Sequence, residues 1–184
     1  MILNELRRQV VSSLKQTGET DEQKDSMDLA LMVIDYKNRT AEFSGAYIPC
    51  FKVRVMKDDE IIKWASGEME MEDGALSNGK YLLETVDANM MPVGISAKMD
   101  KEFTYTEWKL EKDLSYYLFT DGYTDQFNGN TGKKFMKRNF KKLILDIQSY
   151  PMSKQKEILE ERLMSWKGSS PQVDDILVIG LKAE

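Results

Sequence analysis

The sequence predicts an α+β fold built on antiparallel sheet, in one domain spanning residues 1–184. The middle of the chain is rich in period-two alternation, and its strand-like segments are joined by short turns rather than by helices. Helical periodicity is confined to the two ends of the chain. This order of elements is typical of α+β proteins, and 184 residues is an ordinary length for one domain.

The first third of the chain is predicted to be a helix followed by strands. Residues 2–16 place apolar side chains at helical spacing, namely Leu3, Leu6, Val10 and Leu14. Residues 28–36 (DLALMVIDY) are apolar on both faces, which is typical of a strand buried on both sides. A turn at 37–40 then leads into alternating segments at 41–47 and 51–55.

The remaining elements follow from the same signals. The polar, Gly- and Asp-containing stretch 66–80 is expected to be a loop insertion, and 81–86 a strand. Residues 103–110 and 114–120 are predicted to form a hairpin. Helices are expected at about 133–148 and from near Ser153 to Gly168. Residues 175–182 (DILVIGLK) are predicted to close the chain as a buried strand.

Composition excludes several classes of site. The chain has no histidine and one cysteine, so histidine triads, His-ligated zinc and an internal disulfide are ruled out. A formal net charge of −5 argues against binding to nucleic acid or anionic membranes. No apolar run approaches the roughly 18–20 residues of a membrane span, and no signal peptide is evident, so we expect a cytoplasmic location. Catalysis would have to use carboxylates and a hard metal ion held by oxygens.

Two acidic segments stand at the ends of predicted strands. Asp121-Gly122-Tyr123-Thr124-Asp125 follows one strand, and Asp174-Asp175 precedes another. Aspartates placed at strand ends can reach a shared cleft, as a hard-cation site requires. Residue type alone favours a plain turn for the first segment and a solvated strand entry for the second.

A second charged feature is the basic surface of the first C-terminal helix. It carries Lys133, Lys134, Lys137, Arg138, Lys141 and Lys142. Because the apolar residues of this segment keep helical spacing, the basic residues are interpreted as a solvated outer face. Contact with a phosphorylated or acidic partner is the alternative.

Several segments in this order resemble one family. They are Asp25-Ser26-Met27-Asp28-Leu29-Ala30, Phe43-Ser44-Gly45-Ala46-Tyr47-Ile48-Pro49, Met91-Pro92-Val93-Gly94-Ile95, residues 118–127 (LFTDGYTDQF) and residues 172–180 (QVDDILVIG). The chain resembles the SpoIIE-like bacterial serine phosphatases, a branch of the metal-dependent (PPM, type 2C) protein phosphatases. The resemblance implies two packed antiparallel sheets flanked by helices. It also implies hydrolysis of phosphoserine or phosphothreonine with two Mn²⁺ or Mg²⁺ ions.

The same resemblance assigns roles to individual residues. By position, Asp121 and Asp174 match metal ligands, and Asp125 matches an acidic position acting through water. Asp175 could substitute for Asp174 in a shifted register, and Gly122 matches a glycine that lets the backbone turn tightly beside the metals.

The chain also departs from the family pattern. It contains no Gly-Asp dipeptide, so the upstream aspartate that bridges both ions in the family has no match. The N-terminal strands of the domain are therefore expected to be missing. Two aspartates alone should bind Mg²⁺ weakly, and an exposed sheet edge should favour self-association.

Two alternative functions are therefore expected, and the first is favoured. The first is an incomplete serine/threonine phosphatase domain that acts on a phosphorylated regulatory protein of the kind that controls sigma factors. The alternative is a non-catalytic, phosphatase-like module that binds a protein partner.

Overall fold

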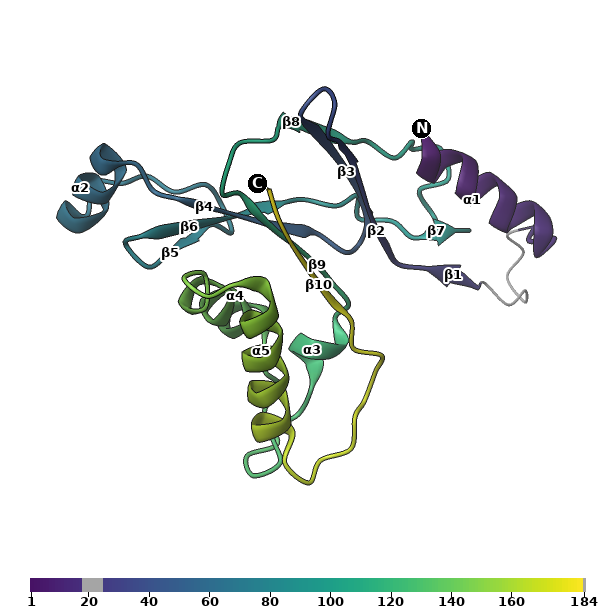
Figure 1. The fold of residues 1–184 in the computed structure, drawn as a ribbon. Coiled ribbons are helices and arrows are strands. Elements are labelled where there is room, and N and C mark those ends of the chain that lie inside the picture. The colour runs from purple at the N-terminus through teal and green to yellow at the C-terminus, as the bar shows by residue number, and fades with distance from the viewer. Residues whose placement is uncertain (18–24, 184) are drawn as a thin grey trace. The chain divides into compact units, whose positions relative to one another are not determined.

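The computed structural model describes residues 1–17 and 25–183. The chain divides into two compact units, Met1–Cys50 with Val86–Leu110, and Phe51–Thr85 with Glu111–Glu184. Each unit combines antiparallel strands with helices, so the predicted α+β class is confirmed (Figure 1). That both units form one domain stays a prediction. Within the described ranges, no helix is long and apolar enough to cross a membrane.

The described residues of the first unit form one helix and two small sheets. Helix α1 (Ile2–Ser13) comes first. Strands β2 (Leu29–Asp35), β3 (Thr40–Ala46) and β8 (Thr106–Lys109) form an antiparallel sheet in the order β2-β3-β8, and β1 (Ser26–Met27) pairs with β7 (Val93–Gly94). The helical spacing of the sequence is confirmed, because α1 buries Leu3 in a cluster with Met91, Val93 and Phe103. The predicted turn at 37–40 joins β2 to β3.

The second unit contains a five-stranded sheet in the order β10-β9-β4-β6-β5. Its strands are β4 (Cys50–Val55), β5 (Leu76–Ser77), β6 (Tyr81–Val86), β9 (Ser115–Phe119) and β10 (Val178–Lys182). Its helices are α2 (Asp58–Ser66), α3 (Gly122–Asp125), α4 (Lys137–Asp146) and α5 (Met152–Lys167). An aromatic core joins β4 and β9 to α4, with Phe119 centred 4.5 Å from Phe51 and 5.1 Å from Phe140.

Helix α5 begins and ends where the sequence predicts. Pro151 precedes its first residue and Gly168, with a positive φ of 51°, follows its last. Proline suits the entry to a helix because its φ is already helical and its missing N–H is not needed there. The expected loop insertion at 66–80 contains the last residue of α2, irregular backbone and the two-residue strand β5.

Three strand predictions are wrong in detail. Residues 103–110 and 114–120 do not form a hairpin, because β8 pairs with β3 while β9 pairs with β10 and β4. The backbone N–H of Leu110 bonds to Arg39 O at 2.8 Å, and that of Asp113 bonds to Ala183 O at 3.1 Å. The two sides of this turn therefore have partners on different strands.

The other two errors concern burial. Strand β2 pairs with β3 alone among the described strands, and Val33 is 41% exposed. The last strand begins at Val178 rather than at Asp175, and its residue Ile179 is also 41% exposed. An apolar run shows that a strand can be covered on both faces, but only its neighbours decide whether it is.

Candidate functional site

Pairing of β9 with β10 brings the two acidic segments to one edge of the sheet. Val178 at the start of β10 lies opposite Phe119 at the end of β9. Because the strands are antiparallel, the segment after Phe119 and the segment before Val178 leave the sheet side by side. All four predicted aspartates, at 121, 125, 174 and 175, belong to these two segments.

Thr120 ties the two segments together. Its hydroxyl donates to Asp175 O at 2.7 Å and accepts the backbone N–H of Leu177 at 2.9 Å. Its own backbone N–H donates to Leu177 O at 3.0 Å. The sequence analysis gave Thr120 no role, and its place between a strand and Asp121 was the available signal. Both functions of a hydroxyl, donor and acceptor, are used here.

Gly122 lies where the two segments approach most closely. A Cβ atom at this position would stand 2.4 Å from Asp175 O, well inside contact distance. Its φ is not among the positive values of the chain. The structure therefore requires glycine at 122 for close backbone approach and not for a left-handed conformation.

The four aspartates differ in how their carboxylates are engaged. Asp121 precedes the short helix α3 and is exposed. Asp174 is exposed too, and its Oδ1 accepts the backbone N–H of Asp175 at 2.7 Å. Asp125, at the end of α3, forms an ion pair with Lys134 in which Nζ lies 2.7 Å from Oδ2. The sequence analysis gave Lys134 no role at the site, and only the tertiary structure places it there.

A buried tyrosine lies directly behind Asp121 and Gly122. The Tyr123 ring packs 4.7 Å from the Phe140 ring, and its hydroxyl donates to Leu159 O at 2.8 Å. Burial raises the pKa of Tyr123 above that of a free phenol. The side chain therefore stays protonated and anchors α3 rather than acting as a base.

The donor set fits a hydrated ion better than a two-ion centre. Carboxylate oxygens are the ligands that Mn²⁺ and Mg²⁺ favour, and Mg²⁺ is often held by one or two carboxylates plus water. Across residues 1–17 and 25–183, no three acidic or cysteine side chains are grouped closely enough to hold a metal ion. Asp121 and Asp174 supply the kind of oxygen donors that a hydrated ion takes, and the described residues alone do not supply a two-metal centre.

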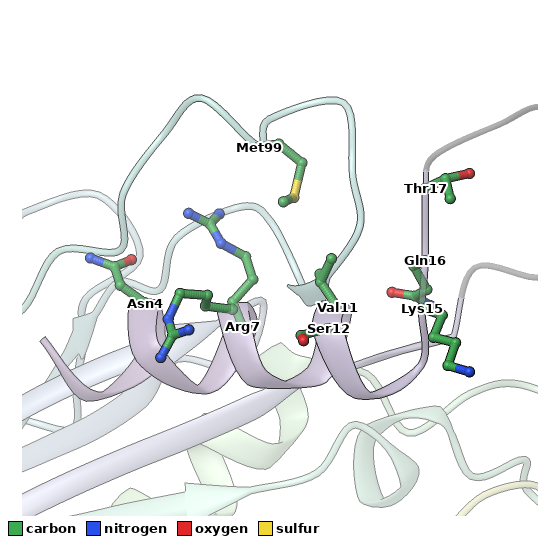
Figure 2. Close-up of a pocket in the computed structure, with 9 residues that line it drawn as sticks. Asn4, Arg7, Val11, Ser12, Lys15, Gln16, Thr17 and Met99 are labelled. Carbon is green, nitrogen blue, oxygen red and sulfur yellow. The ribbon is translucent and has the colours of Figure 1, made fainter.

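The described residues line further hollows in each of the two units. In the second unit, a cavity of about 740 Å³ lies between α5 and β10, and Tyr123, Leu159 and Ile176 contribute to its wall. In the first unit, a hollow of about 600 Å³ runs along α1, and Figure 2 shows Arg7, Lys15 and Met99 among its lining residues. None of the described residues that line the α1 hollow is acidic.

Comparisons with known proteins identify the family. The family described as Stage II sporulation protein E (SpoIIE) matches residues 1–184. No curated protein gives a significant match. The SiaA-PP2C domain of Pseudomonas aeruginosa is similar in structure, with a TM-score of 0.73 and 23% identity over 100% of this chain. The chain spans 60% of the length of that domain chain.

A second similar structure comes from Bacillus subtilis. The phosphatase domain of the cell fate determinant SpoIIE matches with a TM-score of 0.51 and 13% identity, over 100% of this chain and 72% of that one. At these identities the likeness shows the fold, which is that of a PP2C-type phosphatase domain. With the family match over its whole length, the chain belongs to the SpoIIE family.

Proposed function

We propose that this chain is part of a metal-dependent protein phosphatase that hydrolyses phosphoserine or phosphothreonine in a regulatory protein. The observation that carries the proposal is the junction at Thr120, which holds Asp121-Gly122 beside Asp174-Asp175. Membership of the SpoIIE family supports it. So does the fold shared with the SiaA-PP2C domain and with the SpoIIE phosphatase domain.

Asp121 and Asp174 are the residues that would hold an ion. One structure of the Bacillus subtilis SpoIIE domain is described as Mn presoaked, which supports Mn²⁺ or Mg²⁺ as the cofactor class. When bound, such an ion supplies an activated water nucleophile and neutralises charge on the phosphoryl group. Asp175 is the alternative ligand. Asp125 would act through water, because Lys134 already occupies its Oδ2.

The chain's own residues set the limits of this chemistry. Without histidine, proton transfer falls to carboxylates. Gly122 leaves room for the Asp175 backbone, so that the acidic segments stay adjacent. Because the two acidic segments supply few direct ligands, we expect weak metal binding by this chain.

Mn²⁺ binding and hydrolysis should be measured separately. We expect saturable Mn²⁺ binding by the chain, and loss of that binding in Asp121→Asn and Asp174→Asn. The matched control is Asp146→Asn, an exposed aspartate at the end of α4, which should bind like the unchanged chain. Equal Mn²⁺ binding by all four proteins would contradict the assigned ligands.

Hydrolysis of p-nitrophenyl phosphate with and without Mn²⁺ then tests the activity. Mn²⁺-dependent turnover that disappears in Asp121→Asn supports the phosphatase. Turnover that persists in Asp121→Asn would refute the assigned site. If neither this chain nor a version extended upstream binds Mn²⁺ or hydrolyses p-nitrophenyl phosphate, the phosphatase is refuted and the non-catalytic binding module remains.

A further inference from the structure

The basic surface of α4 is the charged feature that the proposed site does not use. Six basic residues fall between positions 133 and 142, and no acidic residue lies between Asp125 and Asp146. This concentration occurs in a chain whose formal net charge is −5. Lys137, Arg138 and Lys142 of α4, together with Lys133 in the segment that precedes the helix, form what we call the basic α4 face.

The basic α4 face is exposed and points away from the core. Phe140, Leu143 and Ile144 of the same helix are buried in the aromatic cluster. Lys137, Arg138 and Lys142 are exposed. Arg138 and Lys142, four residues apart, lie on the side of α4 opposite Phe140, and Lys137 is the first residue of the helix. Figure 1 shows α4 following α3 in the second unit.

The side chains of this face have no counter-charge of their own. Within the described residues, Lys133, Lys137, Arg138 and Lys142 take part in no ion pair. Two neighbouring lysines are engaged elsewhere. Lys134 pairs with Asp125, and Lys141 Nζ lies 2.8 Å from Thr85 Oγ1.

Like charges four residues apart, such as Arg138 and Lys142, destabilise a helix. An anion that neutralised the basic α4 face would remove this repulsion. The face therefore favours an acidic partner over open solvent.

The basic α4 face begins next to the candidate site. The segment leading into α4 bonds to α3, with Met136 N–H donating to Thr124 O at 2.7 Å and Phe135 N–H donating to Gln126 O at 3.0 Å. The Lys134–Asp125 ion pair spans the same junction. A peptide bound at Asp121 could thus extend over the helix.

The charges of the site and of the basic α4 face indicate which charges a bound peptide should carry. The aspartates of the site repel a phosphate dianion, and a neighbouring cationic face offsets that repulsion and guides the approach. We propose that the basic α4 face docks the acidic residues that flank the phosphorylated serine or threonine of a protein substrate. This inference rests on the proposed function.

The experiment uses the full chain and measures binding by fluorescence anisotropy, without metal. The probe is a labelled phosphoserine peptide flanked by glutamates. The comparisons are the same peptide flanked by lysines and a single-stranded oligonucleotide of equal charge. The test variant is K137E/R138E/K142E. The matched control K37E/K109E/K112E makes the same charge change at three exposed lysines that are not part of the basic α4 face.

We expect the test variant to bind the glutamate-flanked peptide about tenfold more weakly than the unchanged chain, and the control to stay within about twofold. Binding should also weaken as salt rises, because exposed charges are screened over about 8–10 Å at physiological ionic strength. Equal losses in both variants, or no preference for acidic flanks, would overturn the proposal. An oligonucleotide that binds at least as tightly would overturn it in favour of nucleic acid.

Failure of the docking proposal is distinguishable from failure of the proposed function. Peptide binding that depends on the basic α4 face, in a chain without Mn²⁺-dependent hydrolysis, supports docking and counts against the phosphatase. Mn²⁺-dependent hydrolysis with no loss of peptide binding in the test variant supports the phosphatase and overturns docking.

Discussion

Replacing Gly122 by alanine tests how the two acidic segments are held together. The added Cβ would stand 2.4 Å from Asp175 O, about 1 Å closer than an ordinary van der Waals contact. The Asp175 carbonyl cannot retreat without cost, because it accepts the Thr120 hydroxyl at 2.7 Å. One of the two segments must therefore shift.

The expected size of the effect follows from these contacts. Loss of the Thr120 hydrogen bond costs about 1 kcal/mol. Overpacking against backbone adds about 1–3 kcal/mol. Alanine in place of glycine in a helix recovers about 0.5–1 kcal/mol. Gly122→Ala should thus lower the free energy of unfolding by about 2 kcal/mol, and it should weaken Mn²⁺ binding.

Urea unfolding followed by circular dichroism measures the stability change. Gly180→Ala is the matched control, because its Cβ would meet the flexible side chain of Met152, with Sδ at 3.1 Å, and the Tyr117 ring at an ordinary contact distance of 3.4 Å. This variant should stay within about 0.5 kcal/mol of the unchanged chain. If Gly122→Ala unfolds at the same urea concentration as Gly180→Ala, the close approach of the segments is not what requires glycine.

Two further predictions concern stability. Tyr117→Phe should cost about 1–3 kcal/mol in urea unfolding, because the buried hydroxyl donates to Gln155 Oε1 and accepts from Gln148 Nε2 at 2.5 Å; an unchanged midpoint would contradict that network. Arg54 holds the pKa of Glu60 at about 2, below its ordinary 4.5. The stabilisation is present above pH 4.5 and is lost as pH falls toward 2. Glu60→Gln should therefore lower the free energy of unfolding by about 1 kcal/mol at pH 7, because a partly exposed ion pair contributes little more than that. If the substitution lowers it by the same amount at pH 2.5, this account is refuted.

Local signals predicted α1 and α5 well, but they missed α2 in the middle of the chain, and α4 begins at Lys137 rather than at about 133. The 3.6-residue spacing of Leu3, Leu6 and Val10 indicated the packed side of α1. Pro151 and Gly168 marked the ends of α5, because their backbone restrictions act within one or two residues. These features depend on near neighbours in the chain and can be recognised without the fold.

Strand partners could not be predicted in the same way. The turn at 111–113 looked like a hairpin, but β8 and β9 belong to different sheets. An extended segment has similar apolar alternation whichever strand it pairs with, and the choice depends on contacts distant in sequence. The burial of residues 28–36 and 175–182 was overestimated for the same reason.

The sequence by itself determined the α+β class, the helices α1 and α5, and the positions of Asp121, Asp125, Asp174 and Asp175 near strand ends. Only the tertiary structure decided that Thr120 joins the two acidic segments and that Lys134 pairs with Asp125. The reason is that side-chain chemistry and local backbone preference are properties of a residue and its near neighbours. A contact between residues 120 and 175 exists only after β9 and β10 have paired, and no local pattern contains that register.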